Sequence, residues 1–150
     1  MSKNTRNTAF RKVDVDQFSD EIYQEDQAAD ESATGPSDAE VQSLLSKGKN
    51  ADALQYVLTN APISTKNQGV KDKALQSVLK VLMSFKAPEI EAGLKGLDQA
   101  RQDTLMKYIY RGFESPSEGS SAQLLVWHEK LFAVTGLGSV VRVLTDRKRV

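Results

Sequence analysis

The residue types that most often carry out enzymatic chemistry are scarce in this 150-residue chain. Cysteine is absent, which excludes thiolate catalysis, disulfides and cysteine-based zinc sites. The single histidine is His128, and no Gly-x-Ser-x-Gly motif accompanies it to suggest a nucleophilic serine. We therefore expect His128 to hydrogen-bond within a helix interface, and we predict no catalytic residue.

Signals for a cofactor or a metal ion are equally weak. Gly136-Leu137-Gly138 resembles the start of a dinucleotide-binding motif, but Val141 stands where the third glycine belongs and no predicted strand precedes it. The acidic residues lack the spacing of a calcium loop. We expect neither a cofactor nor a metal. An enzyme whose site uses only carboxylates and lysines is an alternative that the sequence leaves open.

The charge is distributed unevenly along the chain, although its net value is zero. Residues 1–12 carry four bases and no acid, residues 13–40 carry ten acids and no base, and residues 41–150 carry sixteen bases and ten acids. Such a division is typical of a tail that works separately from its domain, although a tail that only aids solubility is the other interpretation. The basic charge of the body is too small and scattered to predict nucleic-acid binding.

No membrane or secretory segment is predicted. The basic N-terminus leads into acidic sequence without an apolar stretch, unlike a secretory signal. The longest apolar runs, such as Val81-Leu82-Met83, are interrupted by lysines and are too short to span a bilayer. We expect a soluble intracellular protein.

Residues 1–36 are predicted to form a flexible acidic arm, which Gly35-Pro36 ends. The arm lacks helical periodicity but contains apolar side chains at intervals. Residues 13–16 alternate with the period of an extended strand, which suits a peptide lying along another protein's groove. The candidate partner-binding residues of the arm are Phe10, Arg11, Lys12, Val13, Val15 and Phe18.

Residues 37–150 are predicted to form a helical domain without core strands. The start signals of the first five helices are Ser37 with Glu40, Asn50, Thr65 with Gln68, Pro88 and Asp98. Gly136 and Gly138 separate a sixth helix from a last one. Short helices joined by tight turns favour an all-α fold of about seven helices in an α-α superhelix. A compact orthogonal bundle is the alternative.

The predicted helix around Leu105 has an unusually wide apolar face. Its apolar side chains fill an arc of about 140°, and Tyr108 extends this arc to about 200°, whereas a single core-facing stripe needs about 100°. The helix is therefore either central and buried on two sides, or has an interface on one flank. Trp127 presents the same choice between a core anchor and a binding hot spot.

Several long runs of uncommon composition extend along the whole chain. They include Ser2-Lys3-Asn4-Thr5, Phe10-Arg11-Lys12-Val13-Asp14-Val15-Asp16, Val70-Lys71-Asp72, Val78-Leu79-Lys80-Val81-Leu82, Leu105-Met106-Lys107-Tyr108-Ile109-Tyr110, Trp127-His128-Glu129-Lys130 and Arg142-Val143-Leu144-Thr145. In order and spacing the chain resembles subunit 5, the smallest subunit, of the actin-related protein 2/3 complex.

This resemblance implies a non-catalytic structural subunit of an assembly that nucleates branched actin filaments. It implies a helical body that docks on the β-propeller subunit and its neighbours, and an arm that tethers actin-related protein 2. Tyr108, Trp127 and Arg142 are the candidate partner-binding residues of the body. The expected location is the cytoplasm, in the actin cytoskeleton of the cell cortex and of projections such as lamellipodia, with the nucleus as a second location. A free-standing helical adaptor that binds peptides is the alternative function.

Overall fold

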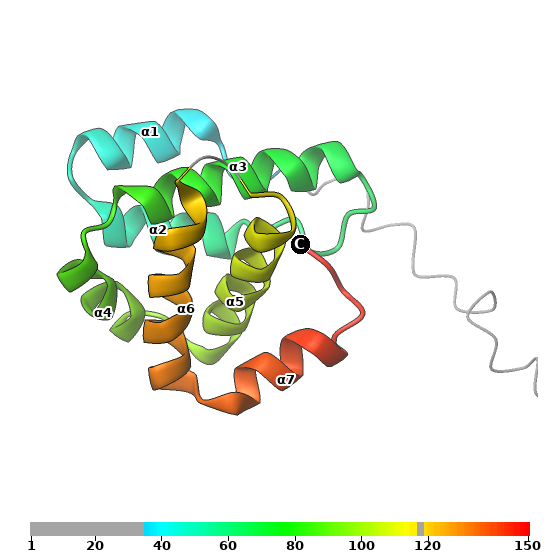
Figure 1. Ribbon diagram of the computed structural model, residues 1–150. Coiled ribbons are helices and arrows are strands. Elements are labelled where there is room, and N and C mark those ends of the chain that lie inside the picture. Colours follow the sequence, from blue (N-terminus) through cyan, green and yellow to red (C-terminus); the bar gives the residue numbers. More distant parts are fainter. Residues whose placement is uncertain (1–34, 117–118) are drawn as a thin grey trace, which may run out of the picture.

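The computed structural model describes residues 35–116 and 119–150, and Figure 1 shows their arrangement. These residues form seven α-helices and no strand, which confirms the predicted all-α fold class. The helices are α1 (Asp38–Ser46), α2 (Asn50–Thr59), α3 (Gln68–Ser84), α4 (Ala87–Lys95), α5 (Gln99–Glu114), α6 (Ser120–Thr135) and α7 (Leu137–Thr145). The predicted arm falls on residues 1–36 and therefore lies almost wholly outside the described part.

Two of the predicted helix starts are confirmed. Pro88 lies in the first turn of α4, where its missing N–H costs no helical hydrogen bond. Asp98 caps α5, because its Oδ1 accepts a hydrogen bond from the backbone N of Arg101 at 2.9 Å.

The capping box predicted at Ser37 is wrong. Ser37 has the extended backbone of an N-cap, but its side chain makes no capping hydrogen bond. Its backbone N instead donates to the hydroxyl of Tyr56 at 3.3 Å, so a contact with α2 replaces the local one.

The caps of the next two helices differ from prediction by one or two residues. Asn67, and not Thr65, caps α3 by accepting from the backbone N of Gly69 at 3.0 Å. Asn50 is the first residue of α2 rather than its cap. Its Nδ2 donates to the carbonyl of Ser84 at 3.3 Å, so the side chain again forms a tertiary hydrogen bond instead of a helix cap.

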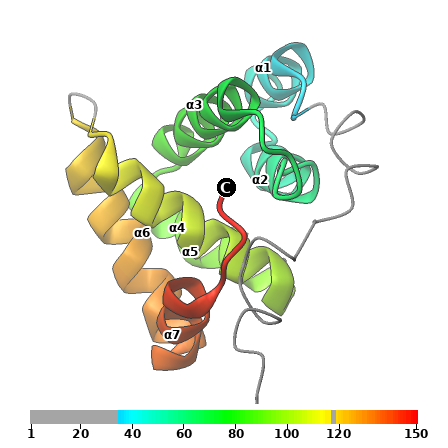
Figure 2. The ribbon, with the colours of Figure 1, turned by 90° about the vertical axis from the view of Figure 1, so that its right-hand side faces the viewer.

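Helices α1, α2 and α3 pack on one another, as do α5, α6 and α7. Helices α1, α2 and α3 run across the view in Figure 1, while α5 and α6 run down it. The view turned by 90° in Figure 2 shows α1, α2 and α3 grouped apart from α5, α6 and α7. Between the two groups, α5 contacts both α2 and α3, and α6 contacts α3.

One hydrophobic core receives side chains from six of the helices. Each of α1 to α6 contributes fully buried apolar side chains to it. In contrast, the only fully buried residue of α7 is Ser139, and the helix reaches the core with half-buried Val140 and Val143. The last helix is therefore attached to the domain mainly through its edge.

The structure explains why glycine is needed at two positions. Gly136 adopts φ +65 between α6 and α7, a conformation that L-residues rarely adopt, and so ends α6 as predicted. A Cβ added at Gly112 would lie 2.8 Å from Cδ1 of Leu124, so this glycine permits the close approach of α5 and α6. Gly138, predicted to separate the same helices, lies inside α7.

Candidate interaction surface

Tyr108 and Trp127, two of the candidate partner-binding residues, lie inside the domain. Both side chains are fully buried in the hydrophobic core. Trp127 packs edge-to-face on Phe85 with ring centroids 5.1 Å apart. A side chain without exposed surface cannot itself contact a partner, so their burial supports the core alternative for both residues.

The hydroxyl of Tyr108 makes no hydrogen bond within the described residues. Burial removes water from the ring and raises the pKa of Tyr108 above its ordinary value. The tyrosine therefore stays neutral and serves as a large apolar side chain in the middle of α5.

Arg142, the third candidate of the body, joins α7 to α5 at the surface. Its Nε lies 2.7 Å from Oδ2 of Asp103, and one of its terminal amino groups lies 2.9 Å from Oδ1. This two-point ion pair matches the planar guanidinium to the planar carboxylate. It orients α7, whose core contacts are few, and leaves the arginine side chain 43% exposed.

His128 forms a hydrogen bond across the interface of α5 and α6, as predicted, and it also contacts aromatic rings there. Its Nε2 lies 3.3 Å from the hydroxyl of Tyr110 on α5. Its ring stacks on Phe132 at a centroid distance of 6.2 Å, and Tyr110 packs edge-to-face on Phe113. These contacts are structural. In the described part of the chain, no group of three or more His, Cys, Asp or Glu side chains could hold a metal ion.

The exposed apolar side chains are concentrated on the last two helices. Seven large hydrophobic side chains are exposed in the described residues, and only Met83 lies elsewhere. We define the α6–α7 apolar surface as the other six: Leu125, Phe132, Val134, Leu137, Val141 and Leu144. Leu144 and Leu137 are the most exposed, at 73% and 65%. Exposed apolar groups gathered on adjoining elements are typical of an interaction site.

The helical period explains why these side chains remain outside. Leu137, Val141 and Leu144 are spaced by four and three residues and share one face of α7. Ser139 and Arg142 lie on the opposite side, where one is buried and the other pairs with α5. The apolar stripe of α7 thus points away from the hydrophobic core of the described residues.

Sequence reasoning did not identify this surface, because helical periodicity alone does not distinguish a core-facing stripe from an exposed one. The signal that could have found it is the composition of α7. Five of its nine residues are Leu or Val, which is more apolar surface than one edge contact buries.

In residues 35–116 and 119–150, no single helix is long and apolar enough to cross a bilayer. Helices α6 and α7 pass that test only as a pair, and they are bent by 108° where they meet.

The arm residues predicted to bind partners all lie outside the described residues. Phe10, Arg11, Lys12, Val13, Val15 and Phe18 precede Gly35, where the description begins. Their role stays a prediction.

Comparisons with known proteins give a consistent result. The model of the family described as "ARP2/3 complex 16 kDa subunit (p16-Arc)" matches residues 9–150. The actin-related protein 2/3 complex subunit 5-C of Xenopus laevis is 55% identical over 150 residues, which cover both chains completely. The human actin-related protein 2/3 complex subunit 5-like protein is 50% identical over 153 residues and is also covered completely. A probable subunit 5 from Caenorhabditis elegans is 36% identical over 146 residues, covering 96% of this chain and 99% of its own length.

Proposed function

The chain belongs to the ARP2/3 complex 16 kDa subunit family, and from this membership we infer that it is a non-catalytic structural subunit of the actin-related protein 2/3 complex. Its activity is then to hold a multisubunit nucleator of branched actin filaments together, in the cytoplasm and the actin cytoskeleton. A nuclear pool is a further proposal. The observation that carries the inference is the full-length similarity at 50–55% identity.

We propose that the helical body docks on the complex through the α6–α7 apolar surface, with the β-propeller subunit and its neighbours as partners. Fully burying one Leu, Val or Phe side chain contributes about 1.5–3 kcal/mol, so Leu137, Val141 and Leu144, which share one face of α7, already provide a substantial driving force.

The docking proposal is tested by replacing Leu137 and Leu144 with Ser in a tagged full chain. Both side chains are mostly exposed, so the variant should fold as before but co-purify with the other subunits at least tenfold less well. Met83→Ser is the matched control, because Met83 is an exposed apolar residue on α3. Recovery of the complete complex with the double variant at the level of the control would contradict docking through this surface.

For the N-terminal arm we propose that residues 1–18 tether actin-related protein 2. Phe10, Val13, Val15 and Phe18 supply apolar contacts in a segment too polar to fold alone, and Arg11 and Lys12 supply charge. Once the body is docked, binding of the arm becomes intramolecular. The effective concentration of the arm is then near millimolar, which is enough for a weakly binding segment to remain bound.

Deleting residues 1–18 tests the tether separately from docking. The truncated chain should remain in the complex, while actin-related protein 2 dissociates more readily and branched nucleation falls. Unchanged retention of that subunit and unchanged branching would refute the tether. A free-standing peptide-binding adaptor would instead be recovered without stoichiometric partners from cells.

A further inference from the structure

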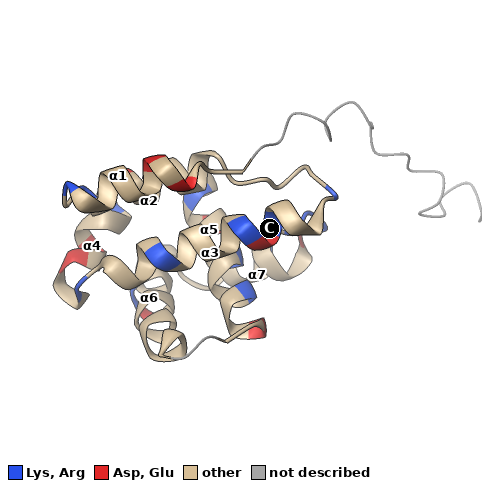
Figure 3. Cartoon of the chain, turned by 90° about the horizontal axis from the view of Figure 1, so that it is seen from above, with Lys and Arg blue, Asp and Glu red and all other residues tan. Residues whose placement is uncertain are grey.

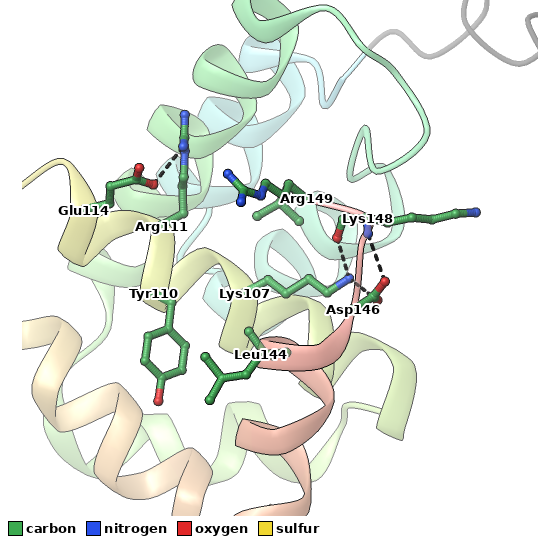
Figure 4. A pocket seen from close by; sticks show the side chains of 10 residues that line it. Lys107, Tyr110, Arg111, Glu114, Leu144, Asp146, Lys148 and Arg149 are labelled. Carbon is green, nitrogen blue, oxygen red and sulfur yellow. Dashed lines mark hydrogen bonds and ion pairs between the residues drawn. The ribbon is translucent and has the colours of Figure 1, made fainter. Parts of the chain in front are cut away.

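The last residues of the chain form a strap that returns to the body. After α7, Asp146 accepts a hydrogen bond from Nζ of Lys107 at 2.6 Å, and the same ammonium donates to the carbonyl of Lys148 at 3.0 Å. The carbonyl of Arg149 accepts from Nζ of Lys71 on α3 at 2.8 Å. The side chain of Val150 is 5% exposed and belongs to the core. The backbone of this basic tail therefore has a fixed place, seen in Figure 4.

A cavity of about 400 Å³ lies between this strap and α5, and its lining is rich in cations. Arg111 is paired with Asp72 and Glu114, and Lys107 is paired with Asp146. Among the described residues, the side chains of Lys148 and Arg149 form no ion pair. Figure 4 shows the guanidinium of Arg149 directed toward Arg111, while Lys148 points outward. Arg149 thus brings to the cavity a positive charge that no acid of the described residues pairs with, and such a charge favours an anionic occupant.

Gly35, the first described residue, packs on the part of α3 that holds this strap. A Cβ placed on Gly35 would lie 3.6 Å from both Val70 and Ala74 of α3. Lys71, which follows Val70, is the residue that holds the carbonyl of Arg149. Figure 3 shows this basic part of α3 next to the C-terminus. The described chain therefore begins at the end of α3 where the strap is held.

The charge of the segment that precedes Gly35 is complementary. Residues 13–34 contain eight acids and no base, whereas residues 35–150 contain sixteen bases and twelve acids. Six of the acids lie in residues 20–31. Glu31 is four residues before Gly35, and four residues span at most about 14 Å when extended. A tether this short gives the acids a high effective concentration at the strap.

We propose that the acidic segment 20–31 of this chain binds intramolecularly to the basic strap, with Lys148 and Arg149 as the recognising cations. This clasp fixes the direction in which residues 1–18 leave the body and shortens their free tether. It does not depend on the identity of any partner subunit.

A spin-label experiment on the full chain tests the clasp. Because the chain has no cysteine, Gln27→Cys provides a unique site for a nitroxide in the acidic segment. The distance to the label is measured by the broadening of the Arg111 and Val150 amide signals, which is the loss of their NMR intensity with the nitroxide oxidised relative to the nitroxide reduced. Because the label is covalently linked to the body, some broadening occurs without any clasp. The broadening that added salt removes is therefore the part that reports on the clasp. We expect this broadening to fall at least twofold at 1 M NaCl, where the Debye length is about 3 Å.

Two double variants locate the interaction. Lys148→Gln/Arg149→Gln should reduce the broadening at low salt, as added salt does. The matched control is Lys47→Gln/Lys95→Gln, which should not reduce it; Lys47 lies at the end of α1 and Lys95 lies on α4. Glu25→Gln/Asp26→Asn removes the opposite charges without touching the folded body and should have the same effect as the strap variant. Broadening that is insensitive to salt, or unchanged by both the strap and arm variants, would overturn the clasp.

Discussion

The indole Nε1 of Trp127 donates a hydrogen bond to the carbonyl oxygen of Leu82 at 3.1 Å, within the hydrophobic core. Leu82 is in the last turn of α3, where helical carbonyls lack their usual intrahelical partner. The same ring packs against Phe85, the residue that ends α3. The carbonyl of Leu82 also accepts from the backbone N of Phe85 at 3.4 Å, so Trp127 is its second donor and joins α6 to the end of α3.

Truncating this side chain should be strongly destabilising. Trp127→Ala removes the hydrogen bond and leaves a large cavity, so the free energy of unfolding of the full chain should fall by about 3–5 kcal/mol. Trp127→Phe should cost less because the ring still fills part of the site. Urea unfolding measures both. Leu125→Ala on the exposed face of α6 is the control, expected to change stability by about 0.5 kcal/mol or less. Equal losses for Leu125 and Trp127 would contradict the core role.

Tyr108→Phe should leave stability unchanged or increase it by about 1 kcal/mol. The hydroxyl of Tyr108 is buried without a hydrogen-bond partner in the described residues, so removing it relieves a desolvation cost. Thermal unfolding of the full chain measures the change. A loss of 2 kcal/mol or more would indicate that the hydroxyl has a partner that this structure does not contain.

The ion pair of Arg142 and Asp103 should hold α7 against α5. Arg142→Lys retains the charge but cannot form both hydrogen bonds, so α7 should open more often. Amide hydrogen exchange across residues 139–145 should accelerate a few-fold, and Asp103→Asn should have a similar effect. The double variant should add little to either single one. Additive effects of the two substitutions would show that the pair does not act as a unit.

Acid should release the strap at its Asp146 anchor. The hydrogen bond from Lys107, together with that from the backbone of Lys148, lowers the pKa of Asp146 below its ordinary value. Because the folded pKa is the lower one, the stabilisation is fully present above the unfolded pKa, near 3.9, and is lost as the pH falls through the folded value.

The amide of Lys148, which donates to Oδ1 of Asp146, reports this step in an NMR titration. Its chemical shift should change with a midpoint below 3.9 in the unmodified chain. Asp146→Asn should abolish that titration at every pH. A midpoint at or above the ordinary aspartate value would show that Lys107 does not hold the carboxylate.

Much of the helical layout could be predicted from local sequence. Pro88 and Asp98 lie at helix starts because ring geometry and side-chain capping act over three or four residues. Ser37 lies at the predicted start of α1, but the side-chain caps predicted for Ser37 and Asn50 do not form, for the opposite reason. Partners that follow them by 19 and 34 residues, Tyr56 and Ser84, compete for their hydrogen bonds.

The sequence by itself determined the family and the all-helical class. Both follow from residue identity or from contacts within a few residues. Only the tertiary structure decided which apolar side chains are inside. Tyr108 and Trp127 are buried because α5 and α6 lie between other helices, whereas Leu137 and Leu144 stay exposed because no element of the described chain covers that face of α7. Periodicity gives a helix an apolar face, but burial depends on whether another element packs against that face.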